Sequence, residues 1–233
     1  MYFQQRSYQK ELLDQPSIPF ADIKRNMQEL NVINQWLGGH RITLKGVQAL
    51  LNHSSSEVRI MEIGCGGGDN LRIIKNWALK NARSVQLTGV DINPECIAFA
   101  QQQLQNKGIT FICSDYRQLT VPERPHIIFS SLFCHHFTEE ELIFLLQWKW
   151  YNSTCGFFIN DLHRHPFAYY SIKVLTRLFS KSYLVKNDAP LSVQRGFVKE
   201  EWNTLLQKAG ISDCSIKWQW AFRWLIIGKK NAA

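Results

Sequence analysis

The sequence of 233 residues lacks several features that would restrict its class. No stretch approaches the about 18 uncharged apolar residues of a membrane span, and Arg6, Lys10, Glu11 and Asp14 interrupt the region where a signal peptide needs an apolar run. We therefore expect a cytoplasmic protein without a membrane span. The six cysteines occur singly, with no C-x-x-C pair and no Cys/His cluster at zinc spacing, so we expect reduced thiols and no metal site.

Composition and charge exclude further classes. The chain is 45% hydrophobic and 12% aromatic, which is typical of a protein that buries a core and excludes general disorder. The formal net charge of +8 favours acidic partners in general. Because the positive charge is spread along the chain without a basic tail, we interpret it as an ordinary basic surface rather than a nucleic-acid site.

The hydrophobic pattern divides the chain into a helical N-terminal extension and an α/β part. Apolar residues at three- and four-residue steps predict helices over residues 20–37 and 42–51, separated by Gly38-Gly39. From Val58 short apolar runs alternate with helical patterns, as in βα units that build a parallel sheet. The predicted strands cover 58–63, 85–90, 109–113, 126–132 and 156–161, with two closing strands within 212–228. The predicted division is an extension at 1–53 and a domain at 54–233, joined through the serines at 54–56.

Capping residues mark helix starts in the α/β part. Asn93 and Pro94 predict the start of one helix, and Thr138 with Glu141 has the spacing of a capping box. Another amphipathic helix is predicted to begin at Val198. Residues 163–197 are too long for a simple connection, so we interpret them as a lid insertion, a helical segment followed by a polar loop.

The strand at 58–63 leads into the segment Gly64-Cys65-Gly66-Gly67-Gly68. A glycine-rich turn lets a ligand approach the backbone closely and directs amide N–H groups toward it, which indicates a nucleotide-type cofactor. The dinucleotide fingerprint G-x-G-x-x-G/A does not match, because Asp69 stands where the third glycine is needed. Three acidic residues accompany the turn: Glu62 precedes it, and Asp91 and Asp115 follow the next two strands.

Together, from about Val58 to Asp161, these features resemble the motifs of class I S-adenosylmethionine-dependent methyltransferases. The resemblance implies a Rossmann-like doubly wound α/β sheet of seven strands, mostly parallel with the last strand antiparallel. It also implies S-adenosyl-L-methionine as cofactor and S-adenosyl-L-homocysteine as product, with Glu62 at the methionine end, Asp91 on the ribose and Asp115 on the adenine. The predicted cofactor-binding set is Glu62, Gly64, Cys65, Gly66, Gly68, Asp91, Ile92, Asp115, Tyr116 and Ser131.

The segment after the fourth strand, Ser131-Leu132-Phe133-Cys134-His135-His136-Phe137, bears on the substrate. It lacks the Asn/Asp-Pro-Pro-aromatic and Pro-Cys motifs of nucleobase-modifying enzymes, which disfavours nucleic acid. It is similar to the corresponding loop of ubiquinone and menaquinone biosynthesis methyltransferases. Since a phenol with a pKa of about 10 keeps its proton at neutral pH, His135 or His136 is a candidate general base, and a purely structural histidine is the alternative.

The extension and the insertion are where we expect a substrate pocket, because the insertion begins at the carboxyl edge of the sheet. The candidate substrate-binding residues are Trp36, His40, Arg164, His165, Tyr169, Tyr170 and Arg195. The leading prediction is O-methylation of an aromatic or polyketide-like hydroxyl in a small-molecule biosynthetic pathway, by a monomer or homodimer. The open alternatives are C-methylation of a quinone-type ring, an RNA or protein methyltransferase, a dehydrogenase and a non-catalytic cofactor-binding module.

Overall fold

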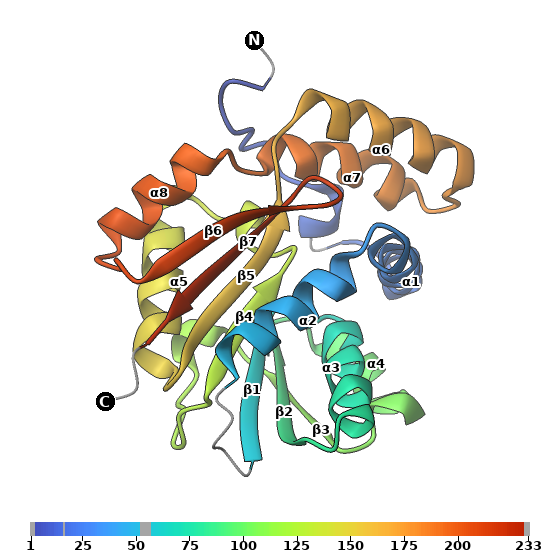
Figure 1. The fold of residues 1–233 in the computed structure, drawn as a ribbon. Helices are drawn as coiled ribbons and strands as arrows, with labels where there is room; N and C mark the ends of the chain where they lie inside the picture. Colours follow the sequence, from blue (N-terminus) through green and yellow to red (C-terminus); the bar gives the residue numbers. More distant parts are fainter. Residues whose placement is uncertain (1–2, 16, 52–56, 231–233) are drawn as a thin grey trace.

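The computed structural model describes residues 3–15, 17–51 and 57–230, and its centre is a seven-stranded sheet with helices on both faces (Figure 1). The strands are β1 (Glu57–Ile63), β2 (Ser84–Asp91), β3 (Ile109–Cys113), β4 (Ile127–Ser131), β5 (Gly156–Leu162), β6 (Cys214–Gln219) and β7 (Arg223–Lys229). Their order is β3-β2-β1-β4-β5-β7-β6, with β7 antiparallel to both of its neighbours and the remaining pairs parallel. The predicted Rossmann-like sheet, with its single antiparallel strand, is confirmed.

The helices are α1 (Phe20–Trp36), α2 (Gly39–Leu50), α3 (Asp69–Lys80), α4 (Pro94–Gln102), α5 (Glu139–Asn152), α6 (Pro166–Phe179), α7 (Tyr183–Arg195) and α8 (Lys199–Lys208). Helices α2, α3 and α4 cover one face of the sheet, α5 and α8 cover the other, and α1, α6 and α7 pack outside these two layers. One apolar core lies under α2, α3 and α4 and the other under α5 and α8. None of these helices within the described residues is long and apolar enough to cross a membrane.

Local sequence signals explain where these elements begin. The Asn93 side chain accepts the N–H groups of Glu95 and Cys96, so it caps α4 ahead of Pro94. Thr138 and Glu141 form the reciprocal capping box of α5. Every residue of β4 is buried, because both faces of this central strand are covered by helices.

The N-terminal extension packs directly against the sheet. Gly38 has φ +77°, which allows the chain to turn sharply from α1 into α2. Gly46 of α2 lies so close to the ring of Phe158 in β5 that a Cβ atom there would be 2.5 Å from it. The predicted joint at 54–56, and with it the domain boundary, lies outside the described residues, so the division into 1–53 and 54–233 stays a prediction.

The insertion differs from the prediction in its second half. The residues expected to form a polar loop form helix α7, which pairs with α6 beyond the carboxyl edge of the sheet (Figure 1). Ser182 caps α7 by accepting the N–H of Val185, while Leu184 and Leu191 are buried. Polar residues such as Asp188 make this segment resemble a loop in the sequence. In the structure Asp188 is only 5% exposed and accepts the N–H groups of Leu12 and Leu13.

Three short 3-10 helices carry residues of the candidate site. These are η1 (Leu12–Asp14), η3 (Tyr116–Gln118) and η4 (Cys134–His136). The segment that contains η1 lies against α7, and η4 follows β4 directly. Residues from the beginning, middle and last third of the chain therefore meet at one edge of the sheet.

Candidate functional site

The glycine-rich loop between β1 and α3 has a conformation that side chains rarely allow. The φ angles of Gly64, Gly66 and Gly68 are +75°, +49° and +76°. The loop is held to β2, because the N–H of Gly64 donates to the carbonyl oxygen of Val90 (2.8 Å) and the N–H of Gly66 donates to Oδ2 of Asp91 (2.8 Å). Asp91 therefore braces the loop from the end of the next strand.

A buried polar network lies beside this loop, at the carboxyl ends of β1, β4 and β5. Oε1 of Glu62 accepts from Nδ2 of Asn70 (2.8 Å), and Oδ1 of Asn70 accepts from the hydroxyl of Thr43 (3.2 Å). Nδ2 of Asn160 donates to the hydroxyl of Ser131 (3.2 Å) and approaches that of Thr43 (3.4 Å). These contacts join three sheet strands and two helices into one polar floor.

Two acceptor atoms of this network have no partner among the described residues. They are Oε2 of Glu62, a residue that is 1% exposed, and Oδ1 of Asn160. Burial raises the pKa of Glu62 well above its usual range, because the ionised carboxylate has lost its hydration. Unpaired buried acceptors are costly, so these atoms fit a ligand that brings a cationic hydrogen-bond donor. No sequence motif points to Thr43, Asn70 or Asn160; the one available signal is that Asn160 is an asparagine inside an apolar strand.

The remaining candidate cofactor residues lie at the same edge in different environments. Ile92 is 67% exposed next to Asp91, and Cys65 is buried in the loop. The carboxylate of Asp115 accepts hydrogen bonds from the Arg117 guanidinium, which lowers its pKa. The Tyr116 ring is turned into the core, edge-on to Trp148 of α5, so its side chain does not face the cleft.

An apolar cavity of about 380 Å³ lies between α1, α6 and α7. Its walls include Leu30 and Ile33 of α1, Ile172 and Leu175 of α6, and Val185 of α7. The polar residues at its walls include Glu11, His135 and His136. A cavity of this size and lining is typical of sites for small organic molecules.

His135 is fixed by a buried carboxylate. Its Nδ1 lies 2.8 Å from Oδ1 of Asp161, and Oδ2 of Asp161 accepts the N–H groups of Phe133 (3.1 Å) and Cys134 (2.7 Å). Although burial opposes ionisation, the charge of His135 and these hydrogen bonds hold the pKa of Asp161 at about 2. The ionised Asp161 can only accept, so Nδ1 of His135 carries the proton and Nε2 has a free lone pair when the ring is neutral.

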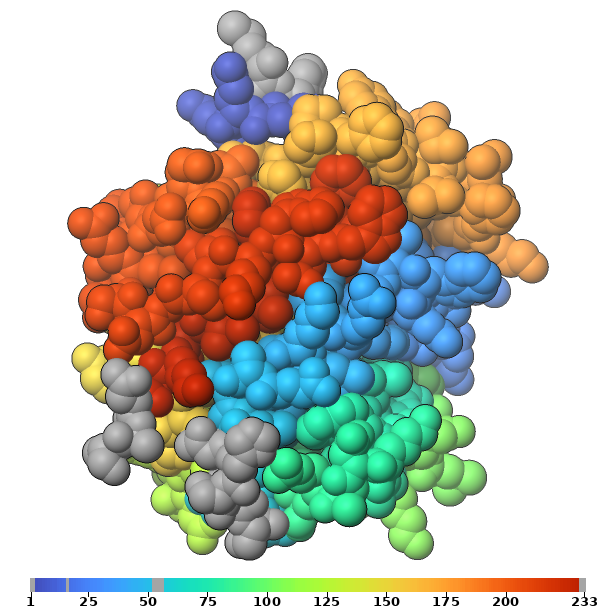
Figure 2. Space-filling view, in the orientation of Figure 1, coloured from blue at the N-terminus to red at the C-terminus, as the bar shows by residue number. Residues whose placement is uncertain are grey.

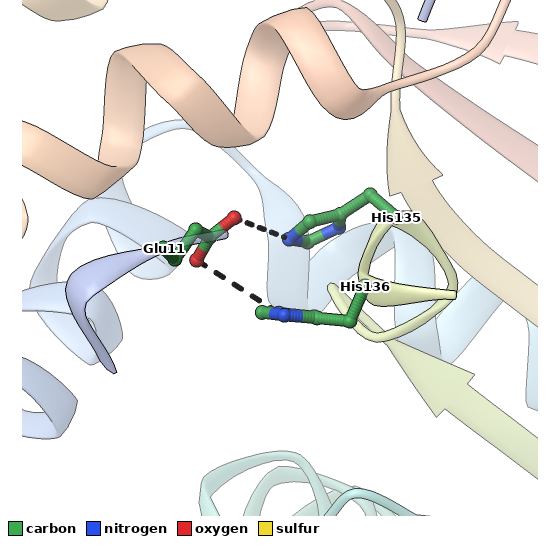
Figure 3. Close-up of side chains that lie close together, drawn as sticks. All are labelled: Glu11, His135 and His136. Atoms are coloured by element: carbon green, nitrogen blue, oxygen red, sulfur yellow. Dashed lines mark ion pairs between the residues drawn. The ribbon is translucent and has the colours of Figure 1, made fainter. Parts of the chain in front are cut away.

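Glu11 faces both histidines (Figure 3). Its Oε1 is 3.6 Å from Nε2 of His135 and its Oε2 is 3.9 Å from Nε2 of His136. Nδ1 of His136 lies 3.2 Å from Oδ1 of Asp14. This contact could not be inferred from the sequence, because Glu11 and Asp14 lie more than 120 positions before the histidines and no local motif relates them.

Within the part of the chain that the structure describes, the seven candidate substrate residues do not line this cavity. Trp36 and His40 instead line a separate, more polar hollow of about 820 Å³ near Trp218 and Trp220. Figure 2 shows on the surface how the tip of the β6–β7 hairpin meets the segment around α2. The pKa of His40 is lowered to about 4, chiefly by burial.

Arg164 is committed to the protein itself, which contradicts its predicted substrate role. It forms a two-point ion pair with Glu201 (2.7 and 2.9 Å), and its other donors reach the carbonyl oxygens of Phe3, Gln4 and Gly196. Its five N–H groups are therefore all used, and a substrate carboxylate has no donor left to bind.

The other predicted residues of the insertion also make internal contacts. Arg195 donates to the carbonyl oxygens of His135 (3.0 Å) and Gln9 (2.9 Å). The His165 side chain accepts the N–H of Phe167 and caps α6. Tyr169 packs edge-on against Phe3 with ring centres 5.5 Å apart, and Tyr170 is 61% exposed. None of these four side chains lines the apolar cavity.

Comparison with known proteins finds a similarity in the central part of the chain. Residues 60–148 match the family model described as a methyltransferase domain. The matched segment includes the glycine-rich loop and both histidines. A search of curated proteins finds no match.

Solved structures share the fold over most of the chain. The plantazolicin methyltransferase BpumL, in complex with SAH, is 18% identical with a TM-score of 0.67, and the alignment covers 94% of this chain and 92% of that one. Human N-acetylserotonin methyltransferase, in complex with SAM, is 20% identical with a TM-score of 0.62 and coverage of 91% and 57%. A Bordetella parapertussis protein described as a possible exported protein is 18% identical, with a TM-score of 0.59 and coverage of 82% and 67%. These structures show the same fold, and the family match agrees with the predicted resemblance to class I methyltransferases.

Proposed function

We propose that this methyltransferase domain transfers the methyl group of S-adenosylmethionine to a hydroxyl group of a small aromatic or polyketide-like molecule. The observation that carries the proposal is His135, whose Nδ1 is held by buried Asp161 while its ring lines the apolar cavity. A base with a fixed orientation beside a cavity of small-molecule size suits a weakly acidic hydroxyl.

The cofactor supplies a methyl group on a positively charged sulfonium sulfur, and this chain must hold it and balance its charge. Glu62 and Asn160 offer their unpartnered oxygen atoms to the ammonium group at the methionine end. Asp91, with lone pairs to spare beyond its two backbone contacts, accepts from the ribose hydroxyls, and Ile92 gives the adenine an apolar surface. These roles follow from the donor and acceptor inventory of the site.

The acceptor lies in the apolar cavity with its hydroxyl toward Nε2 of His135. Nε2 of His135 would accept the hydroxyl proton when the acceptor oxygen takes up the methyl group. Asp161, 2.8 Å from Nδ1, stabilises the imidazolium that results. A positioned base of this kind accelerates a reaction by about 10²–10⁴-fold. The apolar walls exclude water and align the oxygen, which supplies further acceleration.

The test separates cofactor binding from methyl transfer. Calorimetry with S-adenosylhomocysteine should show one site per chain, and incubation with S-adenosylmethionine and a panel of phenols should yield products that are one methyl group heavier. NMR of the product distinguishes O-methylation from methylation of a ring carbon. His135→Ala should retain cofactor binding and lose about 10²-fold or more in rate. Absence of S-adenosylhomocysteine binding to the folded wild type would refute the proposal.

A further inference from the structure

We propose that Glu11, His135 and His136 form a binding site for one divalent first-row transition metal ion, such as Zn²⁺, at the wall of the acceptor cavity. The inference that the ion meets the acceptor rests on the proposed function, whereas the inference that the ion binds does not. The three ligand atoms lie within 4.8 Å of one another and come from segments far apart in the sequence (Figure 3).

The first argument is the orientation of the two imidazole rings. Nδ1 of His135 faces Asp161 at 2.8 Å, and Nδ1 of His136 faces Asp14 at 3.2 Å. Each carboxylate fixes a proton on Nδ1, which leaves the lone pair on Nε2. Metal-binding histidines show this arrangement, in which a carboxylate orients the ring through the nitrogen that does not bind the metal.

The second argument is that acceptors face one another at the centre of the cluster. The Nε2 atoms of His135 and His136 point at the two oxygen atoms of Glu11, at 3.6 and 3.9 Å. Oε1 of Glu11 already accepts the hydroxyl proton of Ser192 (2.7 Å). Lone pairs that converge in a buried place repel one another unless a proton or a metal ion lies between them.

The third argument is the charge balance. Among the described residues, three carboxylates are within 4 Å of the two imidazole rings: Glu11, Asp14 and Asp161. One guanidinium, that of Arg195, is within ion-pair distance of these carboxylates (3.9 Å from Glu11 and 3.3 Å from Asp14). Carboxylates therefore outnumber guanidinium groups at this cluster, and a divalent ion is a partner that this surplus of acidic groups accommodates.

The donor set and its spacing select the kind of ion. Two imidazole nitrogens and one carboxylate are ligands of catalytic zinc and of non-haem iron, both of which keep a position open for water or substrate. Bonds of about 2.1 Å in a tetrahedral site place ligand atoms about 3.4 Å apart, slightly less than the distances from Glu11. Since the three ligand atoms lie within 4.8 Å of one another, metal binding requires the carboxylate and the imidazole rings to draw together.

The protein holds the carboxylate ligand in place before any ion binds. Glu11 is 3% exposed, and the adjoining η1 turn is tied to α7, because Asp188 accepts the N–H groups of Leu12 (2.9 Å) and Leu13 (3.0 Å). Because all three ligands line the cavity, the open side of the ion faces the acceptor. Acceptors that present an oxygen or nitrogen lone pair are therefore the class that this site selects. A bound ion occupies Nε2 of His135, so in the metal-bound protein the ion, and not that nitrogen, would promote loss of the hydroxyl proton.

The experiment measures metal binding directly. Protein dialysed against EDTA is titrated with Co²⁺, whose visible absorption reports on coordination, and with Zn²⁺ by calorimetry. We expect one ion per chain in the wild type and no binding above background in Glu11→Gln and His136→Ala. Asp14→Asn keeps all three ligands but weakens the group that orients His136 and that also accepts the N–H of Glu11 and pairs with Arg195, so it should bind Zn²⁺ about 10- to 100-fold more weakly. His126→Asn, which removes an imidazole at the opposite end of β4, serves as the matched control and should bind like the wild type.

Thermal melts of each variant show whether it folds. If Glu11→Gln does not fold, Asp14→Asn still tests the proposal. Absence of Co²⁺ and Zn²⁺ binding in the wild type would overturn the proposal and leave the cluster as a proton-sharing network. Equal binding in wild type, His136→Ala and Asp14→Asn would also overturn it, because the ion would lie elsewhere. S-adenosylhomocysteine binding is measured on the same samples, so loss of the metal proposal is distinguishable from loss of the proposed function.

Discussion

The carboxylate of Asp188 accepts the backbone N–H of Leu12 at 2.9 Å, across 176 positions of sequence. This contact, together with the one to Leu13, ties the first turn of the chain to helix α7 of the insertion. Both segments then close the cavity that contains His135. The apolar cavity is therefore assembled from contacts between residues far apart in the sequence.

Asp188→Asn tests how much the N-terminal segment depends on this contact. The asparagine side chain has nearly the same volume as that of aspartate, but its Nδ2 group cannot accept a hydrogen bond. One of the two buried N–H groups, of Leu12 or Leu13, therefore loses its partner. Leaving such a donor unsatisfied costs about 1–3 kcal/mol. We expect the melting temperature to fall and the segment at 9–15 to exchange its amide hydrogens faster by mass spectrometry. Unchanged exchange at these residues would show that other contacts fix the segment.

Glu62 is expected to release a proton when the cofactor binds. Burial raises its pKa and so disfavours the ionised carboxylate in the free protein, whereas an arriving ammonium group favours it. The affinity for S-adenosylhomocysteine should therefore rise with pH up to the pKa of free Glu62. Calorimetry in phosphate and in Tris, which differ in ionisation enthalpy, measures the proton. Identical heats in both buffers, or the same buffer dependence in Glu62→Gln, would contradict the prediction.

Gly64 and Gly210 form a matched pair for testing the glycine-rich loop. Both have positive φ, +75° and +73°, but a Cβ on Gly64 would lie 2.3 Å from the Phe133 ring, whereas nothing lies within 4 Å of one on Gly210. Gly210→Ala should cost only the strain of the left-handed backbone, about 1–2 kcal/mol. Gly64→Ala should also displace Phe133 and weaken S-adenosylhomocysteine binding at least tenfold by calorimetry. Equal affinities in the two variants would refute a role of this loop in the cofactor site.

Lys149 is a buried cation whose removal should stabilise the protein. It is fully buried, and its Nζ donates to the hydroxyl of Ser130 (2.8 Å), while burial lowers its pKa from 10.5 to about 8. Below pH 8 folding forces a charged group into the core. As the pH rises from about 8 to 10.5 the unfolded chain holds more protons than the folded one, so this cost disappears.

Lys149→Met should therefore raise the free energy of unfolding by roughly 2–3 kcal/mol at pH 7, and by less at pH 10. Urea denaturation at the two pH values measures the difference between the variant and the wild type. A variant that is less stable at pH 7, or a difference that does not depend on pH, would show that the hydrogen bond to Ser130 outweighs the cost of the buried charge.

The parts of the fold that follow local rules could be predicted from the sequence. The strands around Val58–Ile63 and the capped starts of α4 and α5 depend on alternation and on residues within one turn of each other. Helix α7 could not be predicted, because its polar residues are buried by segments far away in the sequence. Residue type alone did not show that Asp188 faces inward.

The residues of the candidate site likewise fall into those that local sequence rules place and those that only the fold brings together. The glycine-rich loop, Glu62 and Asp91 are neighbours along consecutive βα units, so the sequence places them at one sheet edge. Glu11 meets His135 only because an N-terminal turn docks on a distant helix. Arg164 was misassigned for a related reason, since an arginine in a predicted lid gives no sign that Glu201 and three carbonyl oxygens already engage it.

Helix α1 lies next to both the glycine-rich loop and the apolar cavity. The sulfur of Met27 lies 3.6 Å from the position of a Cβ on Gly66, and Leu30, one turn further along, belongs to the cavity wall. Helix α1 therefore borders both the glycine-rich loop and the apolar cavity. A displacement of this one helix changes the shape of both places at once, so the loop and the cavity are mechanically coupled.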